Sequence, residues 1–205
     1  MRTMSLHDRF LGLATAHGAA SETAERWWRE LERRYSEPHR HYHTLTHIEQ
    51  MLEVLPHAPE TVLAAVWFHD AAYSGSQDEE RSAALAREAL EHLRFPAETI
   101  ALVEQWILAT KTHQAASLPP DGQRFLDADL SILGSDHERY RRYTEEVREE
   151  YAPIPEPVFR GGRAAILTRF LERPRIYATD EFYEKFEQRA RENLAWEIRA
   201  LSATP

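Results

Sequence analysis

Eleven histidines and no cysteine confine any metal site in this sequence to imidazole and carboxylate ligands. Four of the histidines lie close together, at His39, His41, His43 and His47. Only His47 follows the start of a predicted helix, near Leu45, so we expect the other three on the loop that leads into it. By itself, a His-rich helix start is as typical of a solvated surface as of a binding site.

A second segment places a histidine beside an aspartate. In VLAAVWFHDAAY, His69 and Asp70 come at the end of an otherwise apolar run. A buried carboxylate is costly unless it is paired or bound to a cation, and a neighbouring imidazole is a natural co-ligand for that cation. The alternative is that Asp70 caps a helix or forms a salt bridge while His69 packs in the core.

A third segment, FLDADLSILG, carries two acids among apolar residues. Asp127 and Asp129 are two positions apart, so a helix would point them to different sides, and we expect one to cap or pair while the other reaches a metal. Either acid would complete a set of two imidazoles and two carboxylates with His47, His69 and Asp70. Such a mixed set suits Mn, Fe, Zn, Co or Ni, with water at the open positions.

Helices must position these residues, because apolar side chains recur at spacings of three and four and no segment alternates for long. We predict an all-α fold, a single-domain helical bundle over residues 1–205. The predicted helices cover residues 6–17, 22–35, 45–55, 59–73, 78–93, 96–112, 125–133, 136–150, 157–171 and 180–201. We expect the metal-site core within about 35–135, with the C-terminal helices of 136–203 packed against it.

Composition and charge narrow the functional classes. The chain of 205 residues is long enough to bury a core without disulfides, and 42% hydrophobic with 29% charged residues is typical of a globular protein. Its formal net charge of −9 opposes binding to nucleic acid and to anionic membranes. Because no run reads as a membrane span or a signal peptide, we predict a soluble, cytoplasmic protein.

The ordered set of His47, His69, Asp70 and Asp129 resembles the H…HD…D signature of the HD superfamily of metal-dependent phosphohydrolases, which is all-helical. The resemblance extends over nearly the whole chain, to a subgroup of small bacterial HD phosphohydrolases. The segments that carry it are RHYHTLTHI, FHDAAY, DEERSA, ATKTH, FLDADLSILG, VREEY, and the late GR and ARENL. It implies that these four residues hold a divalent metal, with Asp127 as the fallback for Asp129.

The resemblance also implies an enzyme that uses a metal-activated water to cleave a phosphate ester or anhydride of a small, nucleotide-like metabolite. Asp70 and Glu79 are the expected catalytic residues, with Glu79 as general acid or base. A first-turn helix acid is the alternative reading of Glu79. Asp78 departs from the family, which has Asn there. The adjacent His pair of dinuclear members is absent, so we expect one tightly held ion of Mn, Fe, Co, Ni, Zn or Mg.

The expected substrate-binding residues are those that suit a phosphate group: His43, Lys111, His113, Arg148 and Arg163, with Arg40 as a further cation. The alternative for Arg148 is an ion pair on its own charged helix. Arg163 follows Gly161 and Gly162, where a backbone can approach a ligand closely, but a helix entry would use the same glycines.

Two other functions remain open at this stage. One is a non-catalytic nucleotide-sensing module with a structural metal, which has no need of all four ligands. The other is an HD-type metal oxygenase, which would need a richer set of histidines. The long amphipathic C-terminal helices are compatible with a homodimer.

Overall fold

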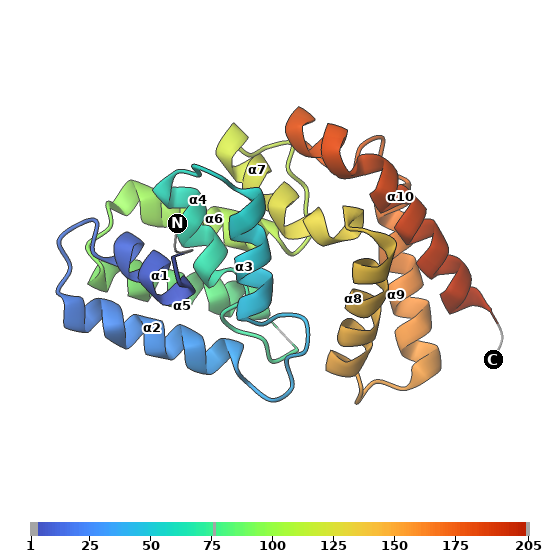
Figure 1. The fold of residues 1–205 in the computed structure, drawn as a ribbon, viewed down its shortest axis with the longest axis horizontal. Coiled ribbons are helices and arrows are strands. Elements are labelled where there is room, and N and C mark those ends of the chain that lie inside the picture. The colour runs from blue at the N-terminus through green and yellow to red at the C-terminus, as the bar shows by residue number, and fades with distance from the viewer. Residues whose placement is uncertain (1–3, 76, 204–205) are drawn as a thin grey trace. The chain divides into compact units, whose positions relative to one another are not determined.

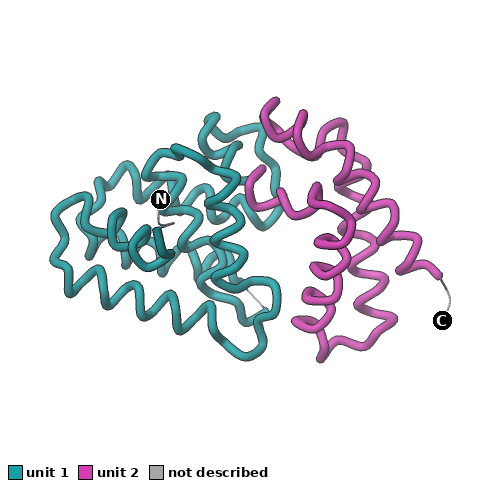
Figure 2. Tube along the Cα trace, in the orientation of Figure 1, with its two compact units in different colours: residues 1–126 teal, residues 127–205 magenta. Residues whose placement is uncertain are grey.

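Residues 4–75 and 77–203 are described by the computed structural model, and these residues form helices and turns with no strand (Figure 1). The predicted all-α class is confirmed. The chain divides into two compact units, Met1–Leu126 and Asp127–Pro205 (Figure 2). The single domain over 1–205 stays a prediction. No helix in the described part of the chain combines the length and the apolar character needed to cross a membrane.

The first unit is built around one helix that is buried on every side. Its helices are α1 (Leu6–Ala14), α2 (Ser21–Tyr35), α3 (Leu45–Val54), α4 (Glu60–Phe68), α5 (Asp78–His92), α6 (Ala97–Ala109) and the start of α7 (Pro120–Asp129). Helix α4 packs against α1, α3, α5 and α6, and its residues Val62 and Ala64 through Phe68 are buried. A helix that is apolar all round belongs in the core of its unit.

Helix α4 is shorter than the sequence predicted, because it ends at Phe68 and not near residue 73. Three of the carbonyl oxygens at this end accept hydrogen bonds from side chains elsewhere in the unit. The Tyr35 hydroxyl donates to the Trp67 oxygen (3.1 Å), and the Arg40 guanidinium donates to the oxygens of Asp70 (2.7 Å) and Ala71 (3.2 Å). The last carbonyls of a helix need such donors, and these donors turn the chain away from the helix axis.

Helix α7 begins earlier than predicted, at Pro120 and not near residue 125. Proline fits the first turn of a helix, because its missing N–H is not needed there. Gly122 then lets the helix lie directly against Trp106, since a Cβ at this position would come within 2.8 Å of the indole Nε1. The Pro- and Gly-rich stretch that the sequence suggests as a break is therefore the start of a packed helix.

The second unit consists of a 3-10 turn followed by three long helices. These are η1 (Leu130–Gly134), α8 (His137–Glu150), α9 (Glu156–Leu171) and α10 (Asp180–Ser202). Buried carboxylates hold the loop before α10. Asp127 accepts hydrogen bonds from the Ala178 N–H (2.8 Å), the Thr179 N–H (2.8 Å) and the Thr179 hydroxyl (2.6 Å). Glu187 accepts from the N–H groups of Ile176 and Tyr177.

Burial raises the pKa of Asp127, and the hydrogen bonds from Thr179 and Ala178 work in the opposite direction. We expect Asp127→Ala to lower the free energy of unfolding by about 2–4 kcal/mol, because three donors lose a buried acceptor. Urea denaturation followed by circular dichroism measures the change. Asp121→Ala, an exposed acid on the same helix, is the control and should cost about 0.5 kcal/mol. Equal stability of the two variants would contradict this structural role.

Candidate metal centre

Two buried imidazoles face each other in the first unit. His47 lies in the first turn of α3, and His69 is the residue that caps the end of α4. Their exposed fractions are 2% and 1%, and their Nε2 atoms are 3.2 Å apart. The Phe125 ring packs edge-on against His69 with centroids 5.8 Å apart, which leaves the imidazole little room to rotate.

The orientation of His69 is fixed by its other ring nitrogen. Nδ1 lies 3.0 Å from the carbonyl oxygen of Val66, one turn earlier in α4. A carbonyl oxygen only accepts, so Nδ1 carries the hydrogen and donates it. In the neutral ring, Nε2 then presents a lone pair toward His47. A backbone carbonyl that sets the tautomer in this way is the usual support of a metal-binding histidine.

Asp70 brings a carboxylate to the same point. Its Oδ2 lies 3.0 Å from Nε2 of His69 and 3.8 Å from Nε2 of His47, and its side chain is 22% exposed. Three possible metal-ligand atoms therefore meet in a largely buried space. A divalent cation would satisfy all three at once, whereas each would otherwise compete for a proton. The donor set and its burial fit a metal ion.

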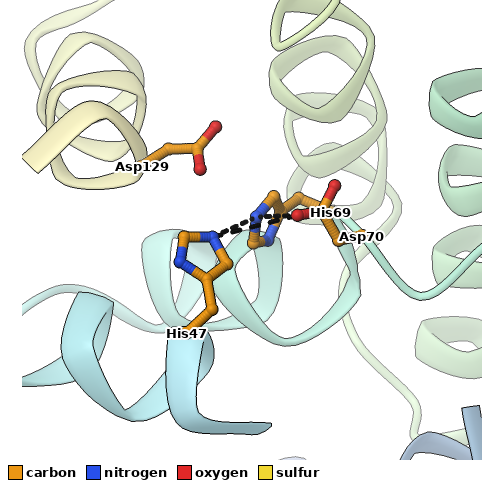
Figure 3. Close-up of side chains that lie close together, drawn as sticks. All are labelled: His47, His69, Asp70 and Asp129. Atoms are coloured by element: carbon orange, nitrogen blue, oxygen red, sulfur yellow. Dashed lines mark hydrogen bonds and ion pairs between the residues drawn. The ribbon is translucent and has the colours of Figure 1, made fainter. Parts of the chain in front are cut away.

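A fourth ligand comes from α7, which begins in the first unit and ends at Asp129. The four side chains are shown in Figure 3. One ligand atom from each of His47, His69, Asp70 and Asp129 lies within 4.8 Å of all the others. Ligand atoms about 2.0–2.2 Å from a shared ion are separated by about 3–4.4 Å, so small side-chain shifts suffice. The group is compatible with a metal-dependent function.

The two acids of the DADL segment have different surroundings, as their spacing predicts. The carboxylate of Asp127 is engaged with Ala178 and Thr179, while Asp129 belongs to the four-residue group. Within the second unit, burial raises the pKa of Tyr143, and the charge of Asp129 contributes in the same direction. Asp127 differs from Asp129 because its hydrogen-bond donors, Ala178 and Thr179, lie about fifty residues further along the chain. The spacing of the two acids in the sequence does not reveal these donors.

Arg40 holds the backbone of the HD segment in place. Its guanidinium donates to the carbonyl oxygens of Asp70, Ala71 and His43, and its Nε donates to Glu37 at 3.1 Å. The aromatic rings of Tyr35 and Tyr73 lie 5.2 Å from the guanidinium carbon, and the Arg40 side chain is fully buried. The sequence predicts a phosphate-binding cation here, but the structure gives Arg40 a supporting role that residue type alone did not reveal.

His43, a predicted substrate-binding residue, lies beside the cluster. Its Nε2 is 3.9 Å from Oδ2 of Asp70, its ring stacks on Tyr73 with centroids 4.5 Å apart, and its side chain is 23% exposed. It therefore lies between the buried imidazoles and the solvent. Glu79, in the first turn of α5, is half-buried and is not a member of the four-residue group.

The other predicted substrate-binding cations have acidic or backbone partners. Lys111 pairs with Glu80 at 2.6 Å, and Arg148 pairs with Glu156 at 2.8 Å. Arg163 pairs with buried Glu197 at 2.8 Å. Burial alone would lower the pKa of Arg163, but the charges of Tyr143 and Glu197 outweigh it and hold that pKa well above its ordinary value.

His113 follows α6 in a left-handed conformation, with φ 48°, and is half-buried. Its role in substrate binding stays a prediction.

We expect Arg40→Lys to weaken metal binding by about 10–100-fold, because lysine cannot donate to two adjacent carbonyls and Asp70 loses its fixed backbone. Titration with Mn²⁺ against a chromogenic chelator measures the affinity. The matched control is Arg33→Lys on the exposed side of α2, which pairs with Glu30 and should leave affinity unchanged. Wild-type affinity in Arg40→Lys would show that this contact does not support the site.

Comparisons with known proteins gave no match to a family model, a curated protein or a solved structure. The group of two imidazoles and two carboxylates, compatible with a bound metal ion, is therefore the basis for any conclusion about function.

Proposed function

We propose that the protein is a metal-dependent phosphohydrolase of the HD type, which cleaves a phosphate ester or anhydride of a small metabolite. The observation that carries the proposal is the convergence of His47, His69, Asp70 and Asp129. The order and spacing of the same four residues carry the resemblance to the HD superfamily. The sequence pattern supports the hydrolase class, and the geometry supports a metal-dependent function.

The chain supplies the ligand geometry for this reaction. A divalent ion bound here would supply a water acidified toward neutral pKa and would polarise a phosphoryl oxygen. His47 and His69 present Nε2 from buried rings, so their positions do not depend on the substrate. Asp70 directs Oδ2 toward the imidazoles, and its carboxylate is the group we propose to orient the attacking water.

His43 is the residue we propose for proton transfer at the leaving oxygen. Its Nε2 lies beside Asp70, its ring rests on Tyr73, and it is partly open to solvent. An imidazole is the side chain best suited to take up and release a proton near neutral pH. Such help is worth about 10²–10⁴ in rate. Glu79 is the alternative general acid or base that the sequence suggests.

The substrate we propose is a small phosphorylated molecule and not a nucleic acid. The net charge of −9 opposes long phosphate backbones, and the cations Lys111, Arg148 and Arg163 already pair with acids. Phosphate charge would then be neutralised by the bound ion together with His43.

Metal content tests the site directly. We expect protein purified without chelator to hold about one divalent ion per chain, and His69→Ala and Asp129→Asn to hold less than about a tenth of that. Asp127→Asn and His39→Ala are the controls. His39 is half-exposed and contacts the Tyr73 carbonyl, so its loss should leave metal content unchanged. Inductively coupled plasma mass spectrometry gives the readout, and full occupancy of Asp129→Asn would remove Asp129 from the ligand set.

Phosphate release tests the activity. Across a panel of phosphomonoesters and nucleotides with Mn²⁺, Co²⁺, Ni²⁺ or Mg²⁺, we expect turnover that a chelator abolishes and that Asp70→Ala lowers at least about 10³-fold. His43→Ala should lower kcat by about 10²-fold while metal content stays at the wild-type level. A metal-loaded protein with no turnover on any substrate of the panel would favour a sensing module. Equal turnover by wild type and Asp70→Ala would refute the proposed site.

A further inference from the structure

The α8–α9 hairpin of the second unit exposes an unusual amount of apolar surface. Four large hydrophobic side chains are exposed there: Tyr151 (45%), Ile154 (39%), Val158 (64%) and Ile166 (42%). Among the described residues only three other large hydrophobic side chains are comparably exposed, and they are scattered along the chain. Exposed apolar side chains that gather in one place indicate an interaction surface.

Two of the four, Val158 and Ile166, lie on one face of α9. Leu167 is the one buried residue of this 16-residue helix. Its exposed apolar and small residues follow the spacing i, i+3, i+4, i+7, i+8, which places them on one side. They are Val158, Gly161, Gly162, Ala165 and Ile166. We call this set the α9 face.

A groove runs beside the α9 face toward the end of α8. It has a volume of about 220 Å³, and Val147 and Phe159 line it together with Val158 and Ile166 of the α9 face. Its lining is mostly apolar, so it suits the insertion of an aliphatic side chain from a partner.

Two adjacent glycines in the middle of α9 are costly for the helix. Each lowers helix stability by about 1 kcal/mol relative to alanine. A Cβ at Gly161 or Gly162 would meet no atom within 4 Å, so no contact in the described structure requires a glycine at either position. Gly122 differs, because Trp106 occupies the space of its missing side chain. Exposed glycines with no internal requirement suit the close approach of a second backbone.

The charges around the α9 face favour a second copy of the same chain. Glu149 and Glu150 end α8, and Glu156 begins α9 beside Arg148 and Arg160, whereas Arg169 and Arg173 lie with Glu172 at the other end of α9. The first end therefore has an excess of acids, three against two, and the second an excess of arginines, two against one. Two copies side by side in opposite directions would bring each acidic end to a basic end.

We propose that the α9 face is a homodimer interface, in which α9 packs antiparallel against α9 of a second copy across a two-fold axis at Gly162. Val158 and Ile166 are each four residues from Gly162, so Val158 of one chain meets Ile166 of the other. The absence of side chains at Gly161 and Gly162 lets the two helices approach closely at the crossing point. This proposal is independent of the proposed hydrolase function.

Gly162→Leu tests the interface without threatening the fold. At about 100 µM we expect the wild-type chain to have a mass near twice 23.9 kDa by light scattering, and Gly162→Leu to have the single-chain mass. Leucine favours the helix, so the thermal midpoint of the isolated chain should not fall. The matched control is Gly12→Leu in α1, an exposed helical glycine that also has open space around it, and it should remain dimeric.

Cross-linking tests the antiparallel register, because the native chain contains no cysteine. Gly162→Cys should form an intermolecular disulfide under mild oxidation, since the two positions meet at the axis. Val158→Cys should cross-link with Ile166→Cys in a mixture but not with itself, because two Val158 positions would lie about 12 Å apart along the helices and a disulfide needs Cα atoms within about 7 Å.

Three results would overturn the proposal: a monomeric wild type at about 100 µM, a dimeric Gly162→Leu, or self-cross-linking of Val158→Cys that exceeds its reaction with Ile166→Cys. Monomeric wild type would mean that no second copy covers the face. Dimeric Gly162→Leu would place the interface elsewhere, and the third result would indicate parallel helices.

Discussion

The candidate site depends on how the first unit satisfies the end of a buried helix. Helix α4 lies in the core on all sides, so its last carbonyl oxygens cannot rely on water and need donors from the protein. Nδ1 of His69 and the Tyr35 hydroxyl donate to the Val66 and Trp67 oxygens of the helix, and Arg40 donates to the Asp70 oxygen just beyond its end. The donors that end the helix also orient His69 and turn the chain so that Asp70 lies beside it. The same hydrogen bonds therefore end the helix and place the candidate ligands.

These contacts explain why the cluster favours a cation. Nδ1 of His69 is committed to Val66, which directs the Nε2 lone pair toward His47 and Asp70. Buried acceptors at such distances repel one another unless a positive charge lies between them. A proton can serve only one pair of atoms, whereas a divalent ion serves all of them. His43, at the exposed edge, stays available for exchange with solvent.

The sequence could predict those helices whose bounds depend on the local spacing of apolar residues. The helices expected over 22–35 and 45–55 match Ser21–Tyr35 and Leu45–Val54 within one residue, because amphipathic spacing marks both their faces and their ends. The sequence extended α4 too far because its donors come from distant residues such as Arg40. The sequence did not decide whether Asp127 or Asp129 belongs to the metal group for the same reason. The hydrogen bond that engages Asp127 comes from Thr179, which is distant in the sequence.

The glycines of the chain fall into two kinds: those that a contact inside a unit requires, and those that no such contact requires. Gly122 gives room to Trp106, and Gly134 gives room to the backbone of Phe186, so a contact inside the unit accounts for each of these glycines. Gly161 and Gly162 have no such contact, although they weaken α9 in the same way. The proposed α9 interface would offset the stability that these glycines cost the helix. The first unit therefore carries the candidate metal ligands His47, His69 and Asp70, while the second carries the surface that we propose as an interface.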